Sequence, residues 1–323
     1  GAAVGEVSGG AAGGRGTLGL PLESSAAVAG VASGRAESVA AASAAGLRLE
    51  VRELETWEEY GACVALQREV WGPEFRGCVP EAILMIARKL GGVTAGASDG
   101  SGRLLGFVFG LTGVMGGRLV HWSDRLAVRP ELRALGIGRR LKCFQRDLCL
   151  ERGVEFVYWT YDPLVAANAH FNLNRLGARV VDYLCDAYGR DTGSDLHSGL
   201  GTDRLLVVWP LRDPRVEAVL AGAPGSDPAP FADAPVVNAE LDAEGAAVPV
   251  YRGLPGEDRI RIEVPAEIEA VKAGDRARAW EWRSATRRAF LQALGEGFRV
   301  EAFWRDPEAG RAFYGLDRRP DPG

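Results

Sequence analysis

Apolar and polar residues alternate at 47–54, as they do in a half-buried strand. Three further extended stretches are predicted at 92–98, 103–112 and 118–128. Asp99-Gly-Ser-Gly102 is a hairpin turn and 113–117 is a looser one. The last three stretches should therefore pair as an antiparallel meander.

Two amphipathic segments separate the first strand from this meander. Thr56-Trp-Glu-Glu59 is a capping box, which predicts a helix running to about Trp71. A loop follows, and Pro80 is placed at the first position of a second helix. The order up to this point is strand, helix, helix, strand, strand, strand.

Helices and strands alternate after the meander. A helix is predicted from about Gly136 to Glu151, where Arg152-Gly153 supplies a C-terminal signal. A second helix should end at Gly177. This second helix is predicted at 165–176, after a strand at 154–160, and two further strands are predicted at 179–188 and 203–211.

The residues before and after these elements fall into three segments that differ in composition. Residues 1–46 are rich in Gly, Ala and Ser, and we expect a disordered extension. Residues 212–258 are predicted to be a linker or surface excursion with short strands near 236–238 and 248–251. In the C-terminal extension, 259–318, we expect a strand at 259–264, a helix opened by Pro265, a helix at 277–294, and strands at 298–304 and 311–316.

Net charge and cysteine usage narrow the function classes. A net charge of −5 over 323 residues argues against nucleic acid or an anionic membrane as the main partner. No apolar run reaches the roughly 18 residues of a membrane span. The five cysteines are odd in number and never spaced Cys-x-x-Cys, which indicates free thiols, no metal site and a cytoplasmic location.

The segment Arg133-Ala-Leu-Gly136-Ile-Gly138-Arg139-Arg140 carries the clearest chemistry. Its glycines let backbone approach a ligand, and amides at a helix start have no intrahelical partner, so the pattern predicts a phosphate cradle. A Walker loop would need Lys and a hydroxyl residue after the second glycine, and a Rossmann fingerprint would need a third glycine. An ordinary Gly-rich loop before a helix remains the alternative.

This cradle resembles the Arg/Gln-x-x-Gly-x-Gly/Ala signature of the GNAT superfamily of acyl-CoA-dependent N-acyltransferases, and the element order is similar. The resemblance implies an α+β fold with a mixed, mostly antiparallel sheet whose central parallel strands splay apart. A large GNAT subgroup with a C-terminal extension is similar over most of the chain. The matching residues are Asp162, Asn168, Asn172, Asp203, Arg204, Trp209, Trp282, Arg283, Thr286 and Arg287.

The resemblance implies acetyl-CoA or another short acyl-CoA, succinyl-CoA included, as co-substrate, with no metal. Asn168 would bond the pantetheine amide, although an Asx cap competes. By position, backbone at three residues of the strand before the cradle would bind the pantetheine arm and six cradle residues the pyrophosphate. The first set is Leu126, Ala127 and Val128, and the second is Arg133, Leu135, Gly136, Ile137, Gly138 and Arg139.

Asp124 stands where many GNAT members have a general base, but an ion pair with Arg125 explains it equally well. His121 is a candidate proton relay or a structural histidine. Leu173 occupies the place of the usual tyrosine that protonates the departing thiolate. Tyr161 is a candidate donor in its stead, with core packing as the alternative.

Arg283 and Arg287 lie four residues apart on one helical face, so they could bind a carboxylate of the acceptor, or pair with Glu281 or Asp275. The sequence thus predicts an N-acyltransferase acting on a small-molecule amine, an amino acid among the candidates, whose subunits could form a homodimer. The alternative is a CoA-binding regulatory or scaffold protein without turnover. A nucleotide-binding module of another fold is a more distant one.

Overall fold

The computed structural model describes residues 48–189 and 200–318. The predicted N-terminal extension lies outside these residues. The elements of the first part are β1 (Glu50–Glu53), α2 (Trp57–Trp71), α3 (Glu81–Lys89), β2 (Val93–Ser98), β3 (Leu104–Met115), β4 (Arg118–Val128), the 3-10 helix η1 (Pro130–Leu132), α4 (Ile137–Glu151), β5 (Phe156–Tyr161), α5 (Ala166–Ala169), the π-helix η2 (His170–Arg175), β6 (Arg179–Leu184) and β7 (Arg204–Pro210). Their order is the predicted one.

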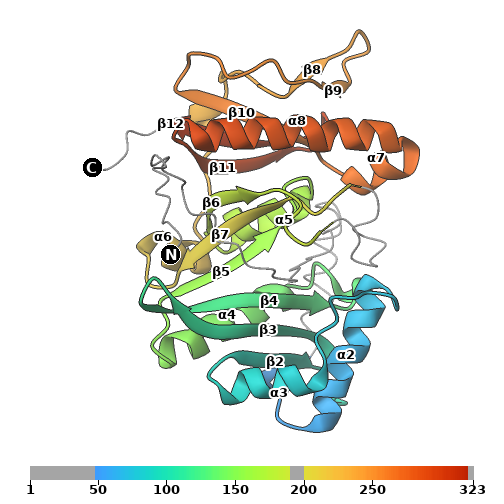
Figure 1. Ribbon diagram of the computed structural model, residues 1–323, viewed down its shortest axis with the longest axis vertical. Helices are drawn as coiled ribbons and strands as arrows, with labels where there is room; N and C mark the ends of the chain where they lie inside the picture. The colour runs from blue at the N-terminus through green and yellow to red at the C-terminus, as the bar shows by residue number, and fades with distance from the viewer. Residues whose placement is uncertain (1–47, 190–199, 319–323) are drawn as a thin grey trace, which may run out of the picture.

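These strands form one sheet in the order β1-β2-β3-β4-β5-β7-β6 (Figure 1). All neighbours are antiparallel except β4 and β5, which are parallel. The parallel pair needs a crossover, and α4 supplies it. The mixed, mostly antiparallel sheet confirms the predicted fold class.

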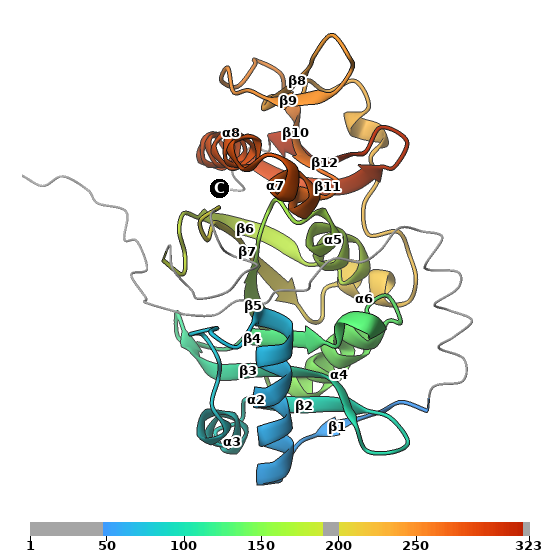
Figure 2. The same ribbon diagram turned by 90° about the vertical axis from the view of Figure 1, so that its right-hand side faces the viewer.

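Helices cover both faces of the sheet (Figure 2). On one face α2 and α3 pack against Phe107, Phe109 and Ala127 in a separate core. On the other, α4 packs against Val108 and Leu126 in the main core. The side chains of consecutive strand residues point to opposite faces of a sheet, so Leu126 packs in the main core and Ala127 in the separate one.

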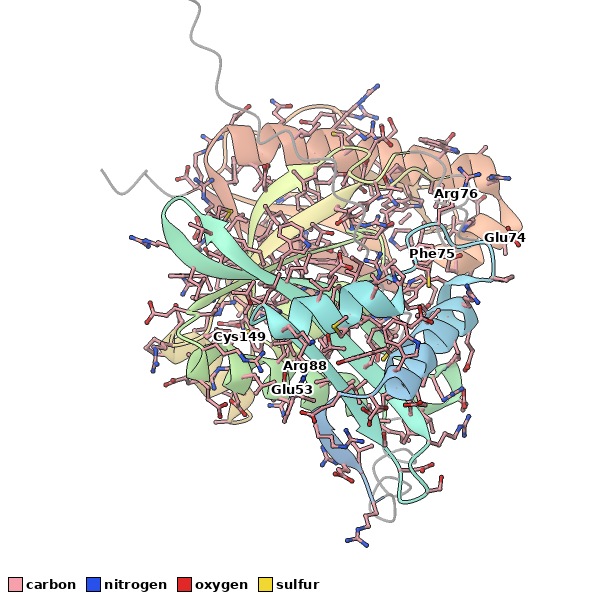
Figure 3. All side chains as sticks on the ribbon, turned by 60° about the horizontal axis from the view of Figure 1, so that its bottom comes forward. Glu53, Glu74, Phe75, Arg76, Arg88 and Cys149 are labelled. Carbon is pink, nitrogen blue, oxygen red and sulfur yellow. The ribbon has the colours of Figure 1, made fainter. Side chains whose placement is uncertain are left out.

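Glu53 links the helices on the two faces at the β1 edge (Figure 3). Its carboxylate lies 2.7 Å from Arg152 after α4 and 3.9 Å from Arg88 of α3. The capping box at Thr56 is present, with the side chains of Thr56 and Glu59 each accepting from the other's backbone N–H.

Two local features differ from the sequence prediction. Pro80 is the N-cap of α3 and not its first helical residue. The helix after β5 continues as far as predicted, but its second half is a π-helix, a form that often occurs at functional sites.

The C-terminal part contains α6 (Pro214–Leu220), the 3-10 helix η3 (Ala229–Phe231), β8 (Ala239–Leu241), β9 (Ala247–Pro249), β10 (Arg259–Pro265), α7 (Ile268–Gly274), α8 (Arg276–Gly295), β11 (Phe298–Asp306) and β12 (Arg311–Arg318). Helix α6 lies in the segment predicted to be a linker. Asp213 caps it and Pro214 opens it, a short helix-start signal that the linker prediction does not include. The prediction that Pro265 opens a helix is wrong, because Pro265 is the last residue of β10, opposite Arg311.

Strands β10, β12 and β11 form a second sheet, which α8 covers (Figure 1). This unit packs on β6 and η2, at the opposite edge of the large sheet from β1. The main apolar core is continuous between the two parts and includes Trp159, Phe290 and Tyr314. The C-terminal part is therefore joined to the first part through buried side chains.

Two arginines of α8 strengthen this junction. Arg283 donates to the Asp162 carboxylate at the end of β5 (2.6 Å) and to the Leu200 carbonyl (2.9 Å). Arg287 holds the fully buried Asp203 carboxylate with two hydrogen bonds of 2.7 and 2.5 Å. Both guanidinium groups are thus already paired with carboxylates, which corrects their predicted role as ligands of an acceptor's carboxylate.

We expect Arg287→Met to lower the free energy of unfolding by about 3–5 kcal/mol, because Asp203 would remain buried without its charge partner. Burial alone would raise the pKa of Asp203, but hydrogen bonds from Arg287 and Tyr183 hold it below its ordinary value. Urea unfolding measures the effect. Arg288→Met, an exposed neighbour on α8, is the matched control, and equal losses in the two variants would contradict the assignment.

Candidate active site

The start of α4 is an open cradle of backbone amides. Gly136 is its N-cap in the left-handed conformation (φ 76°), and no side chain caps the helix. The N–H groups of residues 137–139 have no acceptor within the helix, because the first i to i−4 bond runs from the Arg140 N–H to the Gly136 carbonyl. A Cβ at Gly136 would meet nothing within 4 Å, so the cradle is accessible.

Two arginines near the cradle differ in what they bind. Arg139 donates through Nη2 to the Leu220 carbonyl at the end of α6 (2.6 Å). Its side chain is therefore used to hold α6, and its contribution to an anion would be its backbone N–H. Arg133 is half-buried and makes no ion pair within the described ranges 48–189 and 200–318. Of the two arginines, it is therefore Arg133 whose guanidinium could bind an anion.

Strands β4 and β5 part immediately after they meet. Only His121 with Val157 and Trp122 with Tyr158 are paired. The Arg129 N–H bonds to the Leu105 carbonyl on the β3 side, at 2.9 Å. Because successive N–H groups of a strand alternate in direction, those of Leu126 and Val128 point to the other side, into the opening between the two strands.

A glycine cradle that follows a strand splayed from its parallel neighbour, in this order of elements, decides the architecture. This is the GNAT fold.

No protein-family model matches this chain, and no curated protein does. Solved structures with a similar fold include the ribosomal-protein-S18-alanine N-acetyltransferase of Escherichia coli, with 17% identity over 50% of this chain and 94% of the other and a TM-score of 0.40. Aminoglycoside 6'-acetyltransferase type Ii has 19% identity over 51% and 98%, and a TM-score of 0.40. The GNAT-family N-acetyltransferase YhbS of Escherichia coli, solved in complex with CoA, has 20% identity over 55% and 87%, and a TM-score of 0.34. The fold assignment rests on this chain's own strand order and splay.

Two buried polar atoms on the segment from β5 to α5 lack hydrogen-bond partners within the described residues. They are Oδ1 of Asn168, on α5, and the hydroxyl of Tyr161, at the end of β5. Asn168 does not cap its helix, so the competing Asx-cap interpretation is not observed. The contact of Asn168 with the pantetheine amide stays a prediction, and burial raises the pKa of Tyr161 well above its ordinary value.

Gly138 lies against apolar side chains from both sides of the opening. A Cβ there would contact Leu126, Val128 and Phe171 at 3.7–3.8 Å. Phe171, on η2, thus reaches the start of α4, a contact that the sequence did not suggest.

Asp124 lies on β4 at a bulge, where the register with β3 shifts between Phe109 and Gly110. Its side chain is buried, 5% exposed, and its carboxylate is 2.9 Å from Arg125. Burial outweighs the attraction of Arg125 and raises the pKa of Asp124 to about 6. The ion pair predicted as the alternative is present, and the carboxyl is still suited to accept a proton near neutral pH.

Arg125 is itself fixed by the loop between α2 and α3, in which Figure 3 labels Glu74, Phe75 and Arg76. It donates through Nη2 to the Gly77 carbonyl (2.5 Å), and its guanidinium lies 5.9 Å from the Trp71 ring and 5.5 Å from the Phe75 ring. The Asp124 side of β4 is thus covered by an aromatic loop.

His121 has both ring nitrogens engaged. Thr112 donates its hydroxyl hydrogen to the Gly91 carbonyl (2.8 Å), so the Nδ1–H of His121 donates to Thr112 Oγ1 (3.0 Å). Gln145 donates to Nε2 at 3.0 Å. Burial lowers the pKa of this fully buried ring to about 3, so it is neutral, and its predicted role as a proton relay is replaced by a structural one.

The described ranges 48–189 and 200–318 contain no cluster of three or more His, Cys, Asp or Glu side chains that could hold a metal ion. None of their helices has the length and apolar content needed to cross a bilayer.

We expect Gly136→Asp to weaken CoA binding by at least about 10-fold, because a carboxylate would stand at the positive end of α4, where the pyrophosphate would bind. Gly136→Asn is the matched control, since Asn and Asp both tolerate a positive φ and differ here mainly in charge. Isothermal titration with CoA measures the difference. Equal affinities of the two variants would exclude the cradle as the diphosphate site.

Proposed function

We propose that the protein is an acyl-CoA-dependent N-acyltransferase that transfers an acetyl or other short acyl group to a small-molecule amine. The observation that carries this proposal is the opening between β4 and β5, with unpaired amides of Leu126 and Val128 along one side and the amide cradle of α4 at its end. CoA would complement this arrangement. The amides of its pantetheine arm would pair with the strand, as a peptide pairs with a free sheet edge, and its diphosphate would lie at the cradle.

Asp124 is the proposed general base. An amine is mostly protonated at neutral pH and must lose a proton before it attacks a thioester. Asp124 accepts this proton, and Arg125 limits how far burial raises the pKa of the carboxyl. The loop from Trp71 to Gly77 would line the acceptor's side of the site because it covers this face of β4.

Helix α8 gives no support for an acceptor that carries a carboxylate, such as an amino acid. Arg283 and Arg287, which could have bound that carboxylate, are paired with Asp162 and Asp203. An amine that must lose a proton before attack is the acceptor group that the buried Asp124 supports.

A CoA-binding protein without turnover is the second candidate, favoured by Leu173 at the position of the usual tyrosine. An amine-library screen that follows release of free thiol from acetyl-CoA separates the two. An acyltransferase releases thiol with its amine, whereas a binder releases none although CoA binds.

We expect Asp124→Asn to lower kcat/KM by about 10²–10⁴-fold, the usual contribution of a general base. In the native protein the Asp124 carboxylate is active only when ionised, so kcat/KM should fall as the pH drops through about 6. This fall on the acidic side should be absent from the pH profile of Asp124→Asn.

Asp124→Glu, which keeps a carboxylate, is the control and should retain part of the activity with the acidic limb. CoA affinity and circular dichroism check that each variant is folded. A native pH profile in a folded Asp124→Asn variant would remove Asp124 from the mechanism.

A further inference from the structure

Lys142, on the second turn of α4, is a buried cation that the proposed mechanism does not use. Its side chain is 2% exposed. The ion pairs within 48–189 and 200–318 include none to this lysine. It therefore lies in the interior without a carboxylate to offset its charge.

Neutral groups surround the ammonium. Nζ donates to Ser123 Oγ at 2.9 Å and to Gln145 Oε1 at 2.8 Å. It also lies 3.9 Å from the centre of the Trp159 ring and 5.4 Å from that of Trp209. Two hydrogen bonds and two ring faces accommodate the charge but leave it uncancelled.

The contacts of Lys142 place it at the point where β4 and β5 separate. Ser123 follows Trp122, the last paired residue of β4, and Trp159 follows Tyr158, the last paired residue of β5. The ammonium thus connects the two strands at the closed end of the opening. The cradle of α4 lies at the other end, after β4, so an extended ligand bound by the cradle would have its far end near Lys142.

Retaining an unpaired ammonium here costs stability, because a charge in the interior loses its hydration. Burial lowers the pKa of Lys142 to about 7, and the nearest other titratable groups are Cys143 and Cys149 on α4 and the neutral His121 on β4. No acidic side chain of the packed elements contributes to this pKa. A group kept at such a cost is a candidate for function.

We infer that Lys142 stabilises the CoA thiolate as it leaves, in the role for which Leu173 provides no hydroxyl. This inference rests on the proposed function and deepens it. As the amine nitrogen bonds to the acyl carbon, the C–S bond breaks and its electron pair stays on sulfur. Lys142 gives a proton to the sulfur and later regains one from water, while Asp124 takes the proton that the amine loses.

The bound thiol provides the first test. A free thiol has a pKa near 8.5, and an adjacent cation lowers the pKa of a thiol. Titrating the ultraviolet absorbance of the CoA thiolate in its complex should give a lowered pKa in the native protein and in Lys89→Met, an exposed lysine used as control. In Lys142→Met the pKa should return to that of free CoA, with CoA still bound and kcat reduced by about 10²-fold or more.

The apo protein provides a second readout that does not need turnover. The folded-state pKa of Lys142 is lowered, so between about pH 7 and 10 the unfolded state binds more protons, and the native protein gains stability with rising pH. This gain should be absent from Lys142→Met. The difference in Tm between native protein and variant should therefore change between pH 6 and 9, and Lys89→Met should show no such change.

The outcomes are distinguishable. If the native protein does not bind CoA, the proposed function fails. If CoA binds and its thiol has the same pKa in the native protein and in Lys142→Met, the inference about Lys142 is overturned. If Lys142→Met and Lys142→Gln both fail to fold, Lys142 is a structural residue, which overturns it equally.

Discussion

The structure depends on the gap between β4 and β5, where the backbone groups of two neighbouring strands do not hydrogen-bond to each other. Strands β4 and β5 are neighbours in a seven-stranded sheet, yet they pair at two positions only. A buried amide without a partner is costly, so a gap of this kind persists only where the flanking structure holds the strands apart or a ligand fills the gap. The fold and the proposed function therefore concern the same set of unpaired groups.

Side chains on each side of the gap maintain the separation. Strand β4 is held by pairing with β3 on both sides of the bulge at Asp124 and by two apolar cores, one on each face. Strand β5 is held by β7 and, at its end, by Asp162, which accepts from the Leu164 N–H (2.9 Å) and from Arg283. Because Asp162 begins the turn that leads to Asn168, α8 supports the position of a predicted CoA ligand from outside the sheet.

Features encoded by neighbouring residues could be predicted from the sequence. The capping box at Thr56, the cradle glycines and the order of elements all follow from short-range rules, and each is present. Arg283 and Arg287 could not be assigned, because their partners lie 121 and 84 residues away in the chain. His121 depended in the same way on Gln145, whose contact with it exists only after α4 has folded onto β4.

Ser123 and Asp124 are consecutive residues of β4, and their side chains serve different environments. Asp124 pairs with Arg125 under the loop that follows α2, whereas Ser123 accepts from Lys142 of α4 on the other face. Burial pushes the two titratable groups in opposite directions, raising the pKa of the acid to about 6 and lowering that of the base to about 7. If they shared one face they would neutralise each other as an ion pair. Because β4 separates them, one can accept a proton near neutral pH while the other gives one up, which is the pairing that an acyl transfer between an amine and a thiol requires.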